Sequence, residues 1–245
     1  MRKFEISYYT SHLDAPFSYG LHIEIQKKQD SVSVVMEQQY HDREDMKEED
    51  LIQYGFSAND DITLECKLPL LWWDYINKAY DECEKEKLNE DEDTNLIISF
   101  TDEDEDRMEV PENTDEWEIL LQELQQAVLE VCARELPLQL TYRVCAEKVP
   151  AKEYLLTMKF ENREVLISHN GKAVAQSWED TREMLELLYA QEIQYEKATE
   201  KTPEKAGEWL KDTDGGWYKL YKDIKNSEED EDAIAEIKEF FVHSF

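Results

Sequence analysis

Apolar and polar residues alternate with a period of two along the first part of the chain, and this pattern constrains the fold more than any other. It occurs in four stretches, at residues 4–8, 19–25, 32–36 and 62–68. A period of two is typical of antiparallel strands that bury one face and expose the other. Residues 26–31 are polar and separate two of these stretches, so we expect a hairpin there within an antiparallel meander.

A different spacing predicts the longest helix, over residues 114–135. Six apolar residues share one face of that helix: Trp117, Leu120, Leu121, Leu124, Val128 and Val131. Asn113 or Thr114 can cap its start, and Pro137 ends it. A second helix, rich in aromatic residues, is expected directly after Pro69, because proline suits a first helical position.

Beyond residue 137 the chain returns to strand patterns and then to helical ones. We expect strands at residues 138–144, 154–160, 165–168 and 173–176. Asn170-Gly171 favours a tight hairpin turn, since both residues tolerate positive φ. Helices are then expected from Ser177, where Asp180 approximates a capping box, and over residues 202–210, 217–224 and 227–241.

Together these elements predict an α+β fold. Antiparallel strands dominate the N-terminal half, the long amphipathic helix lies near 114–135, and a second strand–helix unit leads into a helical C-terminal third. We expect a β-rich acidic α+β domain at 1–149 and a smaller strand-hairpin plus helical domain at 150–245, with one continuous domain as the alternative. The order strand–strand–helix at 96–134 recurs at 154–197, which suggests an internal repeat.

The net charge of the chain limits the kinds of molecule that it can bind. The chain has 27 Lys and Arg residues against 59 Asp and Glu residues, a net charge of -32. Residues 42–118 alone hold 28 acidic and 7 basic side chains. Such a field repels phosphate groups, so direct binding to nucleic acid or to an anionic membrane is disfavoured and a basic protein surface is the expected partner. With 41% apolar and 11% aromatic residues, the chain can still bury a core.

The acidic runs are therefore the candidate partner-binding residues. They are Glu44, Asp45, Glu90, Asp91, Glu92, Asp93, Asp102, Glu103, Asp104, Glu105 and Asp106. The alternative for each run is a solvated surface that serves only solubility.

The sequence carries no motif for a known kind of catalysis, and we expect no cofactor and no metal. The glycine patterns of nucleotide sites and of the acyl-transfer serine are missing from the sequence. The histidines lack the close spacing of zinc ligands. EF-hand patterns started at Asp102 and at Asp212 fail, because Arg107 and Trp217 occupy the place of the required glycine.

One arrangement keeps an enzyme as the alternative function. His22 and Glu24 would share a strand face, which is the minimum geometry for a base and its orienting group, and His12 or Asp14 could join them through folding. The same arrangement is ordinary on the wet face of a sheet. The enzyme hypothesis is therefore a site of dispersed His, Glu and Asp residues of unknown class.

The expected location is the cytoplasm. The four cysteines show no C-x-x-C spacing, the first residues lack the apolar segment of a signal peptide, and no stretch approaches the length of a membrane span. We therefore predict a cytoplasmic protein that binds a basic partner, in the manner of an inhibitor or immunity protein with a phosphate-mimicking acidic face. The sequence leaves its oligomeric state open.

Overall fold

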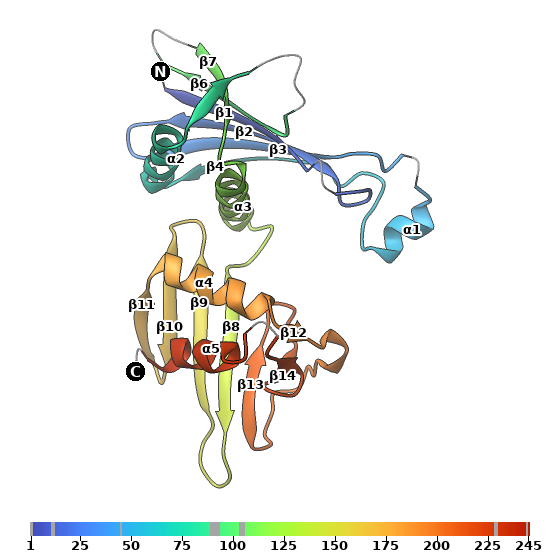
Figure 1. Cartoon of the computed structure of the whole chain (residues 1–245), viewed down its shortest axis with the longest axis vertical. Helices are drawn as coiled ribbons and strands as arrows, with labels where there is room; N and C mark the ends of the chain where they lie inside the picture. The colour runs from blue at the N-terminus through green and yellow to red at the C-terminus, as the bar shows by residue number, and fades with distance from the viewer. Residues whose placement is uncertain are drawn as a thin grey trace. The chain divides into compact units, whose positions relative to one another are not determined.

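The chain is an α+β protein of two compact units, as the prediction of the fold class required (Figure 1). The computed structural model describes residues 2–10, 13–44, 46–88, 94–102, 106–227, 230–243 and 245. The N-terminal unit is Met1–Leu136 and the C-terminal unit is Pro137–Phe245. This division precedes the point at 149/150 that the sequence suggested, because strand β8 (Leu138–Cys145) pairs with strands of the C-terminal unit.

The N-terminal unit is built on a seven-stranded antiparallel sheet. Its strands, in chain order, are β1 (Lys3–Tyr9), β2 (Tyr19–Lys27), β3 (Val32–Tyr40), β4 (Ile62–Leu68), β5 (Lys85–Lys87), β6 (Leu96–Thr101) and β7 (Asp106–Pro111). In space they run β4-β3-β2-β1-β6-β7-β5. The helices are α1 (Glu48–Gln53), α2 (Leu70–Glu82) and α3 (Thr114–Val131).

The alternating pattern assigns the two faces of this sheet. Phe4 and Ile6 are fully buried beneath α2 and α3, which pack on the same side of the sheet (Figure 1). Trp72, Trp73 and Trp117 come from these helices and fill the core. The opposite face carries the polar residues of the alternation and faces solvent.

The C-terminal unit has a six-stranded antiparallel sheet in the order β11-β10-β9-β8-β13-β14. Besides β8 its strands are β9 (Lys152–Lys159), β10 (Glu164–His169), β11 (Lys172–Gln176), β13 (Gly207–Lys211) and β14 (Trp217–Lys219). β12 (Glu192–Ile193) and β15 (Ile224–Lys225) form a separate pair. Helices α4 (Trp178–Tyr189) and α5 (Ala233–Val242) cover one face, and a 3-10 turn spans Tyr195–Lys197 (Figure 1).

Two predicted helices of the last third are strands. Residues 207–211 and 217–219 form β13 and β14, where Leu210 pairs with Tyr142 on one side and Tyr218 on the other. The hairpin between them closes at Gly215, whose φ of +84° suits glycine, and the amide of Gly216 donates to Asp214 Oδ1 at 2.7 Å. Aromatic spacing resembled a helix here, but long-range pairing decides the local structure.

The two units share one topology. Apart from α1 and β5 in the first unit and β12, β15 and the 3-10 turn in the second, each has a four-stranded meander, then a helix, then two strands beside the first strand of the meander, and a final helix. In this correspondence β6, β7 and α3 match β13, β14 and α5. This similarity of topology relates whole units, and it differs from the pairing of 96–134 with 154–197 that the sequence suggested.

Candidate functional site

Three of the eleven candidate acidic residues are described: Glu44, Asp102 and Asp106. The other eight lie outside the described residues: Asp45, Glu90, Asp91, Glu92, Asp93, Glu103, Asp104 and Glu105.

Asp102 and Glu44 occupy opposite ends of the N-terminal sheet. Thr101 pairs with Lys3 and with Asp106, so Asp102 and Asp106 lie at the end where β1 begins. Glu44 follows Tyr40, the last residue of β3, which pairs with the first residue of β2 at the other end. Figure 1 shows α1 beyond that end of β3. The structure therefore does not bring these described residues together into one acidic face.

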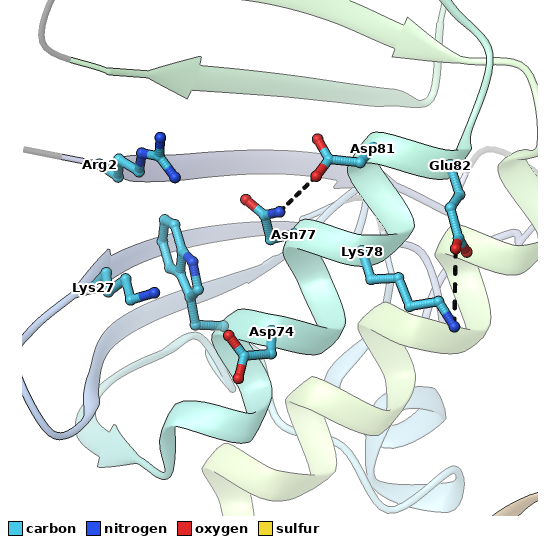
Figure 2. A pocket seen from close by; sticks show the side chains of 8 residues that line it. Arg2, Lys27, Asp74, Asn77, Lys78, Asp81 and Glu82 are labelled. Atoms are coloured by element: carbon cyan, nitrogen blue, oxygen red, sulfur yellow. Dashed lines mark hydrogen bonds and ion pairs between the residues drawn. The ribbon is translucent and has the colours of Figure 1, made fainter.

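A shallow cavity of about 380 Å³ lies beside the Asp102 end of the sheet. Figure 2 shows its lining, which comes from α2 and from the ends of β1 and β2. The lining residues are Arg2, Lys27, Trp73, Asp74, Asn77, Lys78, Asp81 and Glu82. Arg2 also reaches out of the lining, because its Nε donates to Asp102 Oδ2 at 2.9 Å.

Charges of both signs face each other in this cavity. On α2, Lys78 lies 3.9 Å from Glu82, and Asn77 donates to Asp81 at 2.7 Å (Figure 2). Lys27 Nζ lies 5.4 Å from the centre of the Trp73 ring. The lining thus carries three cations, Arg2, Lys27 and Lys78, and three carboxylates, which belong to Asp74, Asp81 and Glu82.

The excess of negative charge belongs mainly to the N-terminal unit. Its 36 acidic and 12 basic residues give a net charge of -24, against 23 acidic and 15 basic residues and -8 for the C-terminal unit. Several of the few cations of the N-terminal unit are already paired within it, among them Arg2 with Asp102 and Arg43 with Asp60. Acidic side chains outnumber the cations threefold, so a large negative potential remains at its surface.

His22 and Glu24 do share the solvent-facing side of the sheet, as predicted. Ser7 Oγ lies 3.1 Å from His22 Nδ1, and His22 Nε2 lies 4.0 Å from Glu24 Oε1. A hydrogen bond from Lys3 lowers the pKa of Glu24. The His22 and Glu24 side chains are about two-fifths exposed, so water reaches the row of Ser7, His22 and Glu24 freely. His12 lies outside the described residues.

The carboxylates of the segment that begins at Asp212, where the EF-hand pattern failed, make hydrogen bonds within the C-terminal unit. Asp212 is buried and accepts a hydrogen bond from the hydroxyl of Tyr189 at 2.7 Å, while Asp214 accepts from Tyr218 at 2.5 Å. Among the described residues, no group of three or more His, Cys, Asp or Glu side chains is placed to hold a metal ion.

Sequence reasoning missed an aromatic patch at the α1 end of the N-terminal unit. We define it as Phe17, Ile52, Tyr54 and Phe56, which come from the β1–β2 loop and from the segment between β3 and β4. The Phe17 ring contacts those of Tyr54 and Phe56, with centroids 5.6 Å apart in each case. No sequence pattern reveals that Phe17, Ile52 and Tyr54 are exposed.

The comparisons with known proteins leave the site to be interpreted from its geometry. Neither protein-family models nor curated proteins nor solved structures match the chain. Within the described part of the chain, the search for a helix that could cross a membrane finds none.

Proposed function

We propose that the protein is a cytoplasmic binding protein whose N-terminal unit engages a positively charged protein surface. The observation that carries this proposal is the net charge of -24 on a unit with an ordinary apolar core. Like charges at this density oppose folding through mutual repulsion, and a cationic partner relieves that repulsion on binding. Electrostatic attraction of this kind accelerates association and weakens as salt is added.

An inhibitor or immunity protein is the form of this function that we favour. Enzymes that process nucleic acids bind phosphate in basic clefts, and an array of carboxylates presents similar charge to such a cleft. The end of the sheet with Asp102 and Asp106, together with the carboxylates of α2, is the surface we assign to this contact.

Affinity capture from the source cell at low salt tests the proposal. The test variant changes Asp102, Asp104 and Asp106 to Asn. The control variant changes Glu147, Glu183 and Glu200 of the C-terminal unit to Gln, which removes the same charge elsewhere. We expect a basic partner on the unmodified and control proteins and little on the test variant. Equal recovery by both variants would contradict the assignment.

An enzyme is the second candidate, and the row of Ser7, His22 and Glu24 is the observation that favours it. The row has the order of a nucleophile, a base and an orienting carboxylate. Its exposure to water places this candidate second, since catalytic sites commonly exclude water. Activated ester hydrolysis that is lost in His22→Asn would support it, and equal rates for both proteins would remove it.

A further inference from the structure

The aromatic patch exposes an unusual amount of apolar surface on a highly charged unit. Phe17 is 46% exposed, Tyr54 is 55% exposed and Ile52 is 63% exposed. Single exposed apolar side chains are ordinary, whereas contacting ones such as Phe17 and Tyr54 form the kind of surface that binds a partner. Tyr40 extends the cluster inward, with its ring centroid 5.8 Å from that of Phe56.

The buried Arg43 connects the segments that carry this patch. The arginine is only 4% exposed, and its guanidinium lies 3.5 Å from the Tyr40 ring centre and 4.1 Å from that of Phe56. Its Nε donates to the carbonyl oxygen of Pro16 at 2.9 Å, and its Nη1 pairs with Asp60 at 2.6 Å. One buried cation thus joins the loop before β2 to both halves of the β3–β4 segment, so the exposed rings are held in a fixed arrangement.

The segments that carry the patch are rich in exposed acidic side chains. Along the segments that carry it, the exposed acidic residues, which we call the acidic rim, are Asp14, Asp42, Glu44, Glu48, Glu49, Asp50 and Asp61. Within the described part of residues 41–61, Lys47 is the one exposed cation, because Arg43 is buried. The surface has an apolar centre and a charged rim, as protein interfaces commonly do.

We propose that the aromatic patch is the docking site for a basic, amphipathic polypeptide segment of the partner. This inference rests on the proposed function and adds a second place of contact, at the end of the N-terminal sheet opposite Asp102, together with its chemistry. An apolar side chain of the segment packs against Ile52 and Tyr54, and its lysines or arginines face the acidic rim. A second copy of this chain would bring -32 against -32, and an anionic membrane would also be repelled, so charge complementarity selects a basic segment.

Two synthetic peptides of equal positive charge test this inference on the full chain. One peptide places leucines among lysines at helical spacing (i, i+3, i+4, i+7) so that its leucines share one face, and the other is an oligolysine with the same number of lysines. Burying one or two apolar side chains makes the first peptide bind about 10-fold tighter or more. Fluorescence anisotropy gives both dissociation constants at several salt concentrations.

The variants separate the patch from the general charge. Ile52→Ser with Tyr54→Ser removes the exposed apolar surface of the patch. Leu136→Ser with Val149→Ser removes residues that are 85% and 59% exposed elsewhere, and circular dichroism confirms folding of both variants. We expect the first double variant alone to lose the extra affinity for the amphipathic peptide while it still binds oligolysine.

Two results would overturn the inference, and they differ in what they mean for the proposed function. If oligolysine binds and the amphipathic peptide binds no tighter, or if its advantage survives in Ile52→Ser with Tyr54→Ser, the patch is not the docking site and the proposed function stands. If neither peptide binds at low salt, the proposed function itself fails.

Discussion

Arg43 and Asp60 form an ion pair in which Nη1 lies 2.6 Å from Oδ2, and the arginine is buried between two aromatic rings. Asp60 also accepts hydrogen bonds from the hydroxyl and the amide of Ser57. The hydroxyl bond from Ser57, followed by its amide and Arg43, lowers the pKa of Asp60 despite the opposing effect of burial. The pair therefore ties the chain on both sides of α1 together.

Asp60→Asn should destabilise the N-terminal unit at pH 7, because it leaves the buried Arg43 without its anion. The expected loss in unfolding free energy is about 1–3 kcal/mol. The folded pKa of Asp60 lies below the unfolded one, so this contribution is present above the unfolded pKa and is lost as pH falls through the folded pKa. Urea unfolding at pH 7 and near pH 3 should show the difference from wild type shrink. Asp74→Asn, an exposed control, should cost little at either pH.

Tyr142→Phe should destabilise the C-terminal unit. The Tyr142 hydroxyl donates to Glu208 Oε1 at 2.8 Å, and Lys238 Nζ lies 2.7 Å from Glu208 Oε2. Burial, together with the hydrogen bond to Glu208, raises the pKa of Tyr142 and keeps the hydroxyl protonated as a donor. We expect a loss of about 1 kcal/mol by urea unfolding, typical of one hydrogen bond. Tyr195→Phe, at an exposed tyrosine, is the control, and equal losses in the two variants would contradict the prediction.

Cys66 should make the N-terminal unit sensitive to alkali. Burial, with the neighbouring Cys132 thiol, raises the pKa of Cys66 from its ordinary value of 9.0 to about 12. Stability from this group is therefore fully present below pH 9.0 and is lost as pH rises toward about 12, because the unfolded thiol ionises first. The decline in unfolding free energy over that range should be shallower in Cys66→Ala. Parallel curves for the two proteins would rule this out.

Leu124→Ala should cost far more than Leu136→Ala. Leu124 is fully buried on α3 beneath the sheet, whereas Leu136 is 85% exposed. A cavity at a buried leucine costs about 2–5 kcal/mol, and an exposed leucine loses almost nothing. Urea unfolding of both variants measures the difference, and similar midpoints would mean that α3 does not contribute to the core as described.

The sequence predicted the elements whose patterns are local. Strands β1 to β4 follow the alternation, and Ser177 caps α4 by accepting from the amide of Asp180 at 3.3 Å, as the capping motif suggested. It failed for β13 and β14, because the pairing of Leu210 with Tyr142 joins residues far apart in the chain. The sequence did not predict the shared topology of the two units for the same reason, since strand order also depends on pairing between distant residues.

The sequence predicted only part of the candidate site. Acidic runs are visible in a sequence, but the placement of Glu44 and Asp102 at opposite ends of a sheet depends on strand register. Arg43, within an acidic run, gave no sign of being buried. The exposure of Tyr54 equally depends on tertiary packing, since a tyrosine in a loop has the same pattern whether it is buried or exposed.

The central claim is that the N-terminal unit binds a basic surface through its negative charge, and salt dependence tests it most directly. The measurement is the dissociation constant of oligolysine for the full chain across a salt series, for wild type and for the Asp102, Asp104 and Asp106 to Asn variant. The Glu147, Glu183 and Glu200 to Gln variant serves as the charge-matched control. We predict affinity that falls steadily with salt and is weakened more by the first variant than by the second. Affinity that is independent of salt, or equal weakening by both variants, would contradict the account.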